Sequence, residues 1–242
     1  MIQMTQLVYP AAVGTVTKNV GESSQHGKEL GADILEIRFD LLLKSVSAET
    51  DEMIENQLIS WIKEAKETNL PIIGTLRASD EGGAFVGSEE ERFRFIQKII
   101  PNVDFMDIEQ KSSIQNILKC RETAEKSKTK IILSSHFFND TPSAEKLKEI
   151  IQNSFEKGAG ISKIAVMPKT AGDVLKLYQA GLEFETNKNS LCLIAMGEIG
   201  KQTRIAAPLY GSILSYGYID EVAAPGQLRV DEIKTGFKLL GF

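Results

Sequence analysis

The sequence predicts an α/β fold of the (β/α)8 barrel type, formed by residues 1–242 as a single domain. Three observations predict it. Short apolar runs and segments with helical periodicity alternate eight times along the chain. The units are spaced roughly 20 to 40 residues apart, which suits a closed parallel barrel better than an open doubly wound sheet. No glycine-rich phosphate fingerprint follows the first apolar run, which argues against a dinucleotide-binding sheet.

The predicted strands are short apolar runs bounded by turn signals. They cover residues 11–17, 33–38, 71–76, 103–108, 130–135, 161–166, 190–196 and 213–219. A short hairpin over residues 4–10 precedes the first strand and is expected to close the bottom of the barrel.

The predicted helices lie between these strands. They cover residues 20–30, 47–68, 88–99, 111–126, 143–156, 170–185, 202–211 and 229–240. Some carry start signals, such as Ser88 followed by Glu91, or Thr141-Pro142 with Glu145 soon after. No linker, low-complexity segment or short repeat interrupts the chain, so one domain is the simplest interpretation.

Composition excludes several classes of function. The chain is 42% hydrophobic and 25% charged, as in soluble globular proteins. A net charge of -5 without a Lys/Arg cluster argues against nucleic-acid partners and polybasic membrane binding. The N-terminal segment lacks the basic start and apolar core of a signal peptide, and no apolar run approaches about 18 residues, so a cytoplasmic protein is expected.

No metal site or disulfide is expected. Cys120 and Cys192 have no partner-like spacing and are interpreted as reduced thiols. The histidines show no metal-ligand spacing, and His26 is expected to face solvent.

One lysine requires an explanation. Lys163 lies in the apolar run ISKIAV, which has the character of a buried parallel strand. Burial disfavours the charged ammonium and favours the neutral amine, which can attack a carbonyl and form a Schiff base. The structural alternative is a lysine whose stem packs against the barrel while its head reaches water.

Other ionisable residues fall where a barrel places its active site, at the C-terminal ends of strands. Glu36, Arg38 and Asp40 are expected to share one inward face, and Thr75 shares a face with Arg77. His136, Met196, Arg204 and the loop 223–228 follow later strands. Separately, Glu36 and Arg38 could be a buried ion pair, His136 a structural histidine and Arg204 part of a helix surface. Together they favour one site for an anionic substrate.

These residue types suit chemistry on a substrate that has a ketone and a carboxylate. Lys163 would condense with the ketone, and His136, with a pKa near working pH, would remove the acidified neighbouring proton. Glu81 could orient the imidazole, and Arg204 could bind the carboxylate with its guanidinium fork. Glu36, Arg38, Arg77 and Gln227 suit hydroxyl groups. Neither a metal nor a nucleotide cofactor is required.

Seven motifs in register resemble those of type I 3-dehydroquinate dehydratases. They are EIRFD (36–40), TLRASDEGG (75–83), SSHFFNDTP (134–142), KIAVMP (163–168), MGEIGKQTR (196–204), YGSILSYG (210–217) and APGQL (224–228). The resemblance covers nearly the whole chain. It implies a (β/α)8 barrel, commonly a homodimer, that removes water from 3-dehydroquinate by syn elimination in the shikimate pathway.

The resemblance also assigns roles. It makes Lys163 the Schiff-base lysine, His136 the general acid/base and Glu81 the carboxylate that orients the histidine. The substrate-contacting positions are Glu36, Arg38, Arg77, Arg204 and Gln227, and the apolar wall positions are Met196 and Tyr216. Ala223 stands where many members have a substrate-binding serine. Members often have a small polar residue on the first strand, here Gly14 or Thr15. The loop 218–228 could act as a lid.

Two other functions remain open. A class I aldolase would also use a lysine Schiff base, and one that acts on sugar phosphates needs a phosphate cradle near the last two strands. A sugar-acid binding protein on a decayed barrel would bind its ligand without covalent trapping. Borohydride labelling and the absorbance of an enone product distinguish these functions.

Overall fold

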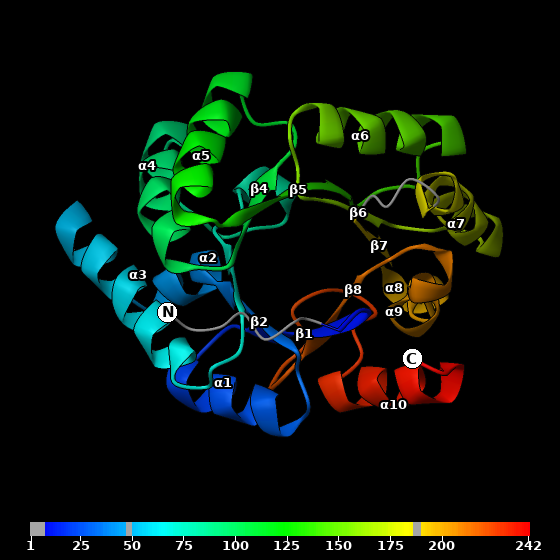
Figure 1. Cartoon of the computed structure of the whole chain (residues 1–242), viewed down its shortest axis with the longest axis horizontal. Coiled ribbons are helices and arrows are strands. Elements are labelled where there is room, and N and C mark those ends of the chain that lie inside the picture. The colour runs from blue at the N-terminus through cyan, green and yellow to red at the C-terminus, as the bar shows by residue number, and fades with distance from the viewer. Residues whose placement is uncertain (1–7, 47–49, 186–189) are drawn as a thin grey trace.

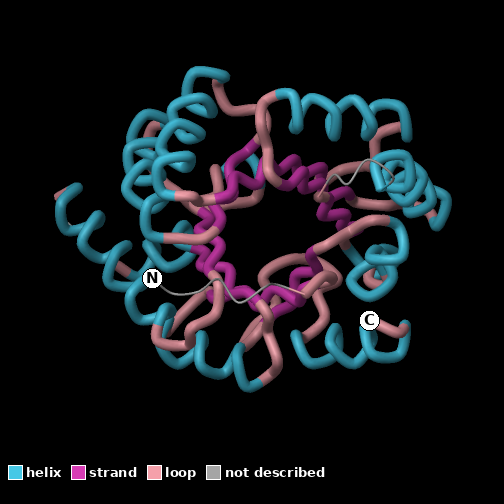
Figure 2. Tube along the Cα trace, viewed as in Figure 1, coloured by secondary structure: helices cyan, strands magenta, loops and turns pink. Residues whose placement is uncertain are grey.

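The computed structural model describes residues 8–46, 50–185 and 190–242. Eight parallel strands form a nearly closed barrel, and helices surround it (Figure 1). Figure 2 shows the strands as an inner ring and the helices as an outer ring. The predicted (β/α)8 architecture is therefore confirmed.

The strands follow the barrel in chain order. They are β1 (Ala11–Val16), β2 (Ile34–Arg38), β3 (Ile72–Thr75), β4 (Phe105–Glu109), β5 (Lys130–Phe137), β6 (Ile161–Val166), β7 (Leu191–Ala195) and β8 (Leu214–Tyr218). Strand β1 pairs with both β2 and β8. Strands β7 and β8 meet near a bridge between Leu191 and Ser212, where the Ile213 N–H donates to the Leu191 carbonyl over 2.8 Å.

Seven longer helices in the described ranges cover the barrel. They are α1 (Val20–Glu29), α3 (Asp51–Lys66), α4 (Glu89–Ile99), α5 (Ile114–Ser127), α6 (Ala144–Glu156), α7 (Ala171–Glu185) and α10 (Val230–Leu240). Ser88 and Glu91 form the predicted capping box of α4. The N-cap of α6 is Ser143, two residues after the threonine in the predicted start signal. None of the helices in the described part of the chain combines the length and apolar composition needed to cross a bilayer.

Some predicted boundaries were wrong. The predicted helix 202–211 is broken into α9 (Thr203–Ala206) and a 3-10 turn at Ala207–Tyr210, after the short helix α8 (Gly197–Gly200). Pro208 explains the break, because proline lacks the N–H that a continuing α-helix needs. Helix α3 begins at Asp51, and residues 47–49 lie outside the described part.

The segments next to β1 and β2 also differ from prediction. Of the predicted hairpin 4–10, residues 4–7 lie outside the described residues, and residues 8–10 form no strand. After β2 the chain turns at once into the four-residue helix α2 (Phe39–Leu42) and a 3-10 turn at Leu43–Ser45. Asp40 therefore lies on a helix and not on the inward face of a strand.

The barrel interior has an apolar layer below a polar one. Residues of the lower layer include Val13, Ile34, Ile73, Phe105 and Ile132, which form one buried cluster. Two residues further along each strand, the next inward-facing side chains are polar and buried. They are Thr15, Glu36, Thr75, Asp107, Ser134 and Lys163. The polar layer lies toward the C-terminal ends of the strands, where such barrels bind their substrates.

Candidate active site

All the predicted site residues line one pocket above the polar layer. The pocket has an empty volume of ≈ 620 Å³ including its open mouth. Its predicted members are Glu36, Arg38, Arg77, Glu81, His136, Lys163, Met196, Arg204, Tyr216, Ala223 and Gln227. The strand and loop ends thus bring together residues from distant parts of the chain, such as Glu36 and Gln227, which are 191 positions apart.

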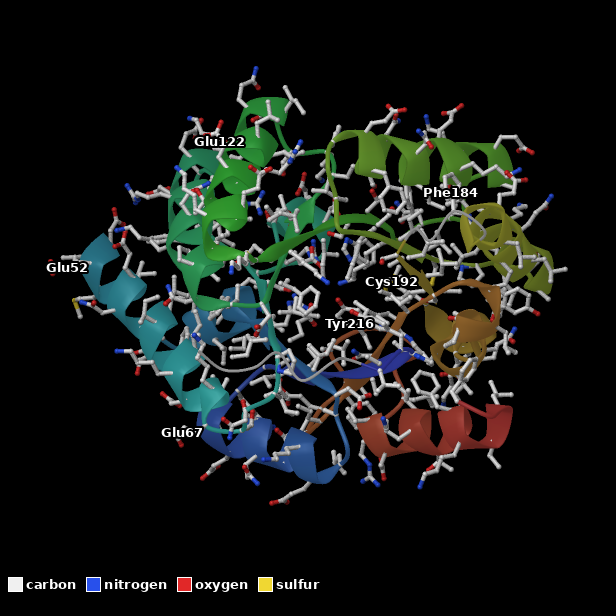
Figure 3. All side chains as sticks on the ribbon, in the orientation of Figure 1. Glu52, Glu67, Glu122, Phe184, Cys192 and Tyr216 are labelled. Carbon is white, nitrogen blue, oxygen red and sulfur yellow. The ribbon has the colours of Figure 1, made fainter. Side chains whose placement is uncertain are left out.

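Lys163 lies inside the barrel and is only 5% exposed. Its Nζ is 2.9 Å from Asp107 Oδ2 on β4 and 3.8 Å from Glu36 Oε1 on β2. The same Nζ lies 4.0 Å from the centroid of the Tyr216 ring, and Figure 3 shows Tyr216 near the centre of the barrel. The solvent-reaching alternative was therefore wrong. Sequence reasoning missed that these two carboxylates lie beside the lysine.

His136 and Glu81 form a buried pair. Nδ1 of His136, at the end of β5, lies 2.8 Å from Glu81 Oε2, in the 3-10 turn Ser79–Glu81. Burial and the cations of Arg77 and Lys163 hold the pKa of His136 well below its ordinary value, and not near working pH as the sequence suggested. Burial raises the pKa of Glu81 to about 7. A neutral imidazole that donates its Nδ1–H to Glu81 keeps Nε2 as a proton acceptor.

Arg77 ties the end of β3 to β4 and β5. Its guanidinium contacts Asp107 at 2.8 Å and Glu109 at 3.2 Å, and it donates to Ser134 Oγ over 2.7 Å. Burial opposes the charge, but the two carboxylates outweigh it and raise the Arg77 pKa. Since most of its donors already have acceptors, Arg77 fixes the geometry around Lys163 as well as lining the pocket.

Arg38 is held by Asp40, which corrects the predicted place of that carboxylate. The Nε and Nη2 atoms of Arg38 donate to the two Asp40 oxygens over 2.9 Å and 2.8 Å. Asp40 also accepts the Ala84 N–H over 3.0 Å, which fixes the loop after β3. Asp40 is fully buried and does not line the pocket. It orients Arg38, which does line it.

Of the two candidates on the first strand, Thr15 faces the pocket and Gly14 does not. Thr15 lines the pocket and donates to Glu36 Oε2 over 3.3 Å, and Thr75 donates to Glu36 Oε1 over 2.9 Å. Gly14 faces the other side of the strand, where a Cβ would meet Ile219 at 3.0 Å.

Arg204 is a buried guanidinium without an ion-pair partner among the described residues. It donates from Nη1 to the Tyr216 carbonyl over 3.2 Å, while its buried Nε has no acceptor there. Burial lowers the pKa of Arg204 to about 10. A buried cation with free donors is costly unless an anion binds it, so this part of the pocket suits a carboxylate.

The loop after β8 covers the pocket through Ala223–Gln227. Gln227 Oε1 accepts the N–H groups of Ala223 and Ala224 over 2.7 Å and 3.0 Å. The Ala223 N–H is therefore occupied and does not replace the side-chain donor of a serine. The Gln227 Nε2 group has no acceptor within the described ranges, so it can donate to a ligand.

Residues at the base of this loop contact α1 and the two residues Thr17 and Lys18 that follow β1. Asp220 accepts from Ser23 Oγ over 2.5 Å and lies 2.8 Å from His26 Nδ1. Glu221 accepts from Thr17 over 3.1 Å and from Lys18 over 3.2 Å. The expectation that His26 only faces solvent was incomplete, since it contacts the loop. These contacts fix residues 220 and 221. The pocket-lining residues beyond them are held by Gln227 and by the Gly197 N–H, which donates to the Pro225 carbonyl over 3.1 Å.

Sequence reasoning missed Asp107, Glu109 and Ser134. A signal existed in the run FMDIE, where Phe105, Asp107 and Glu109 alternate with apolar residues and so share the inward face. Both acids are buried, and Asp107 binds Lys163 and Arg77 together. No group of three or more His, Cys, Asp or Glu in the described ranges is arranged to hold a metal ion.

Comparison with known proteins identifies the family. The family model for type I 3-dehydroquinase matches residues 11–241. The chain belongs to the type I 3-dehydroquinase family. The 3-dehydroquinate dehydratase of Methanococcoides burtonii is 41% identical, covering 96% of this chain and 94% of that protein. The Methanocella arvoryzae 3-dehydroquinate dehydratase is 38% identical over 96% and 97% of the two chains.

Solved structures agree with this assignment to the type I 3-dehydroquinases. The Geobacillus kaustophilus 3-dehydroquinate dehydratase superposes with a TM-score of 0.86 at 29% identity, covering 96% of this chain and 91% of that one. The type I enzyme from Clostridium difficile, solved with covalently modified comenic acid, also superposes with a TM-score of 0.86. It is 26% identical, and the match covers 96% of this chain and 92% of that one.

Proposed function

We propose that this type I 3-dehydroquinase converts 3-dehydroquinate to 3-dehydroshikimate by syn elimination through a Schiff base on Lys163. The observation that carries the proposal is the meeting of three groups in one pocket. A buried lysine amine, an imidazole bound to a carboxylate, and a buried guanidinium that has no ion-pair partner in the described part of the chain suit a substrate with a ketone and a carboxylate.

In this proposal the neutral amine of Lys163 attacks the ketone carbon, and loss of water gives an iminium. His136 Nε2 then takes a proton from the carbon next to the imine, and the electron pair forms an enamine. The enamine expels the hydroxyl on the following carbon, which takes the proton from His136 and leaves as water. Hydrolysis of the new iminium releases the enone product and restores Lys163.

Asp107 is proposed to prepare Lys163 for attack. Its Oδ2 lies 2.9 Å from Nζ, so it holds the lysine head in position for attack on the ketone. Two further groups, Arg77 and Ser134, bind Asp107 Oδ1 and keep the carboxylate oriented.

We expect Asp107→Asn to slow Schiff-base formation, because the amide keeps the shape of the side chain but loses the charge. The rate of borohydride-trappable imine formation should fall by about 10-fold to 100-fold. Rapid quench followed by mass measurement of the trapped protein gives this rate. The matched control is Asp104→Asn. Asp104 immediately precedes β4 and lies at the opposite end of the barrel from the pocket. An equal trapping rate in the Asp107 and Asp104 variants would contradict the role.

The remaining pocket residues are proposed to orient the substrate. Arg204 would bind the carboxylate through its free donors, and Gln227 Nε2 would donate from the covering loop. Glu36 and Arg38 supply an acceptor and a donor for ring hydroxyls, while Met196 and Tyr216 form the less polar wall. Ala223 contributes only its backbone, which Gln227 already engages.

The decisive experiment mixes the purified chain with 3-dehydroquinate and follows the absorbance of the conjugated enone. Absorbance should rise, and borohydride added during turnover should inactivate the enzyme by reducing the imine on Lys163. Constant absorbance at micromolar enzyme would favour a class I aldolase. Ligand binding with neither product nor trapping would favour a sugar-acid binding protein.

The Clostridium difficile type I enzyme was solved with covalently modified comenic acid, which supports the proposal of covalent chemistry. The family resemblance also leads us to propose a homodimer, which light scattering of the purified chain would test.

Ligand binding is expected to order the covering loop. With 3-dehydroshikimate present, proteolysis within residues 218–228 should slow several-fold, because Gln227 gains a ligand contact and the loop opens less often. Timed digestion with mass detection of the fragments gives the rate. Cleavage elsewhere in the chain serves as the internal control, and an unchanged rate within 218–228 would show that the loop does not act as a lid.

A further inference from the structure

A second cation approaches Glu81 from outside the pocket. Lys111 follows β4 by two residues, and its Nζ lies 3.4 Å from Glu81 Oε1 and 2.5 Å from Asp80 Oδ2. Glu81 Oε2 faces His136, so the two oxygens of this carboxylate have different partners. Lys111 and Asp80 do not line the substrate pocket, and both lie on a neighbouring surface groove.

We propose that Lys111 is a positioning residue, whose ammonium holds the outer oxygen of Glu81 and so keeps a charged carboxylate turned toward His136. This inference rests on the proposed function of the His136–Glu81 pair. Asp80 supports it by holding the lysine head beside Glu81, where an unrestrained lysine side chain would sample many rotamers.

The other charged groups around Glu81 do not perform this task. Arg77, at the end of β3, binds Asp107, Glu109 and Ser134 and makes no ion pair with Glu81. Glu109 on β4 is negative and disfavours a second negative charge nearby. In the described part of the chain, Lys111 is therefore the one lysine or arginine within ion-pair distance of Glu81.

The charge of Glu81 is sensitive to such a neighbour. Burial raises its pKa to about 7, and Arg77 and Lys111 act in the opposite direction. A carboxyl group with a pKa near 7 changes its charged fraction strongly between pH 6 and pH 8. The charged form is the useful one, because it stabilises the imidazolium that His136 becomes when it accepts a proton.

The sign of the effect follows directly. Removing a cation next to an acid disfavours the carboxylate and raises the pKa. Without Lys111, Glu81 would remain neutral up to a higher pH, so the acidic limb of the rate profile would move to higher pH. At alkaline pH the carboxylate is charged in either case, and the rates should converge.

The first experiment measures kcat/KM against pH at low ionic strength for wild type and Lys111→Met. The variant should be slower by about fivefold at pH 6 and differ by less than about twofold at pH 8.5, as expected for a partly screened ion pair. Lys111→Arg should restore the profile, and high salt should reduce the difference. The control is Lys146→Met, which removes a surface lysine paired with Glu149 on α6.

A second experiment does not depend on turnover. The chain has only two histidines, so the ring resonances that remain in His26→Gln belong to His136. Their pH titration reports the ionisation of Glu81 2.8 Å away, and its midpoint should rise in Lys111→Met. A shifted midpoint in a chain that does not turn over 3-dehydroquinate would leave this inference standing and reject the proposed function.

Two results would overturn the inference. One is an unchanged pH profile together with an unchanged histidine titration in Lys111→Met. The other is an equal loss of rate at every pH, which would show a structural effect of the substitution rather than an electrostatic one.

Discussion

Lys163→Ala is expected to lower turnover of 3-dehydroquinate by more than about 10⁴-fold and to abolish borohydride labelling. The amine is the only proposed nucleophile, and no iminium can form without it. Neither His136 nor Arg204 can replace the electron-withdrawing effect of the imine. Loss of labelling and loss of rate should therefore occur together.

The fold is expected to survive this substitution. Asp107 keeps its contacts with Arg77 at 2.8 Å and with Ser134 at 2.6 Å, and Glu36 keeps its two threonine donors. Removing one partner of a buried ion pair typically costs about 3–5 kcal/mol, and the remaining contacts should place the loss at or below that range. Thermal unfolding followed by circular dichroism measures this loss of stability. Lys163→Met also removes the amine but leaves a smaller cavity than Lys163→Ala.

A lysine on the neighbouring strand provides the control. Lys130 begins β5, at the opposite end of the barrel from the pocket, and its side chain is exposed. Lys130→Ala should retain both turnover and labelling. Peptide mapping of the trapped wild-type protein must place the added mass on residue 163. Mass on any other lysine would reject the assignment of the nucleophile.

The barrel could be predicted because each strand is an apolar run with clear turn signals. The predicted bounds of β6 match the structure, since ISKIAV is apolar on both faces apart from Ser162 and Lys163. Helix α2 was missed because a four-residue helix has too few residues to show a period of 3.6. Position 40 was consequently placed on a strand face.

The pocket lining could be predicted from one geometric rule, that a barrel binds its ligand at the C-terminal strand ends. The electrostatics could not be predicted in this way. The partners of Lys163 lie 56 and 127 positions earlier in the chain, at Asp107 and Glu36, and only the closed barrel brings them together. For the same reason, the sequence could not show that burial, Arg77 and Lys163 together lower the pKa of His136.

Contacts made by loops were the hardest to predict. Asp80 lies in a 3-10 turn, and Lys111 was predicted to begin the helix 111–126, whereas α5 begins at Ile114. No sequence pattern indicates that the two side chains meet beside Glu81. The choice between Gly14 and Thr15 likewise depended on register. Once β1 and β2 pair with Thr15 opposite Glu36, the threonine must face inward.

His136→Ala is expected to separate proton transfer from imine formation. Removing a positioned general base typically costs about 10²-fold to 10⁴-fold, so kcat should fall by that amount. Lys163 and its carboxylate neighbours remain, so the imine should still form and should accumulate. Borohydride should therefore label the variant as fully as wild type, although hardly any enone appears.

Two further measurements test whether the imidazole acts chemically. Added imidazole should restore part of the lost rate, because a small base can enter the space that His136 leaves. The rate at which the proton is removed from the carbon next to the ketone should fall in parallel with kcat. A variant with the wild-type rate would exclude His136 as the base. A slow variant in which no imine can be trapped would instead mean that the substitution disturbs the surroundings of Lys163, because the His136 ring no longer fills its side of the pocket.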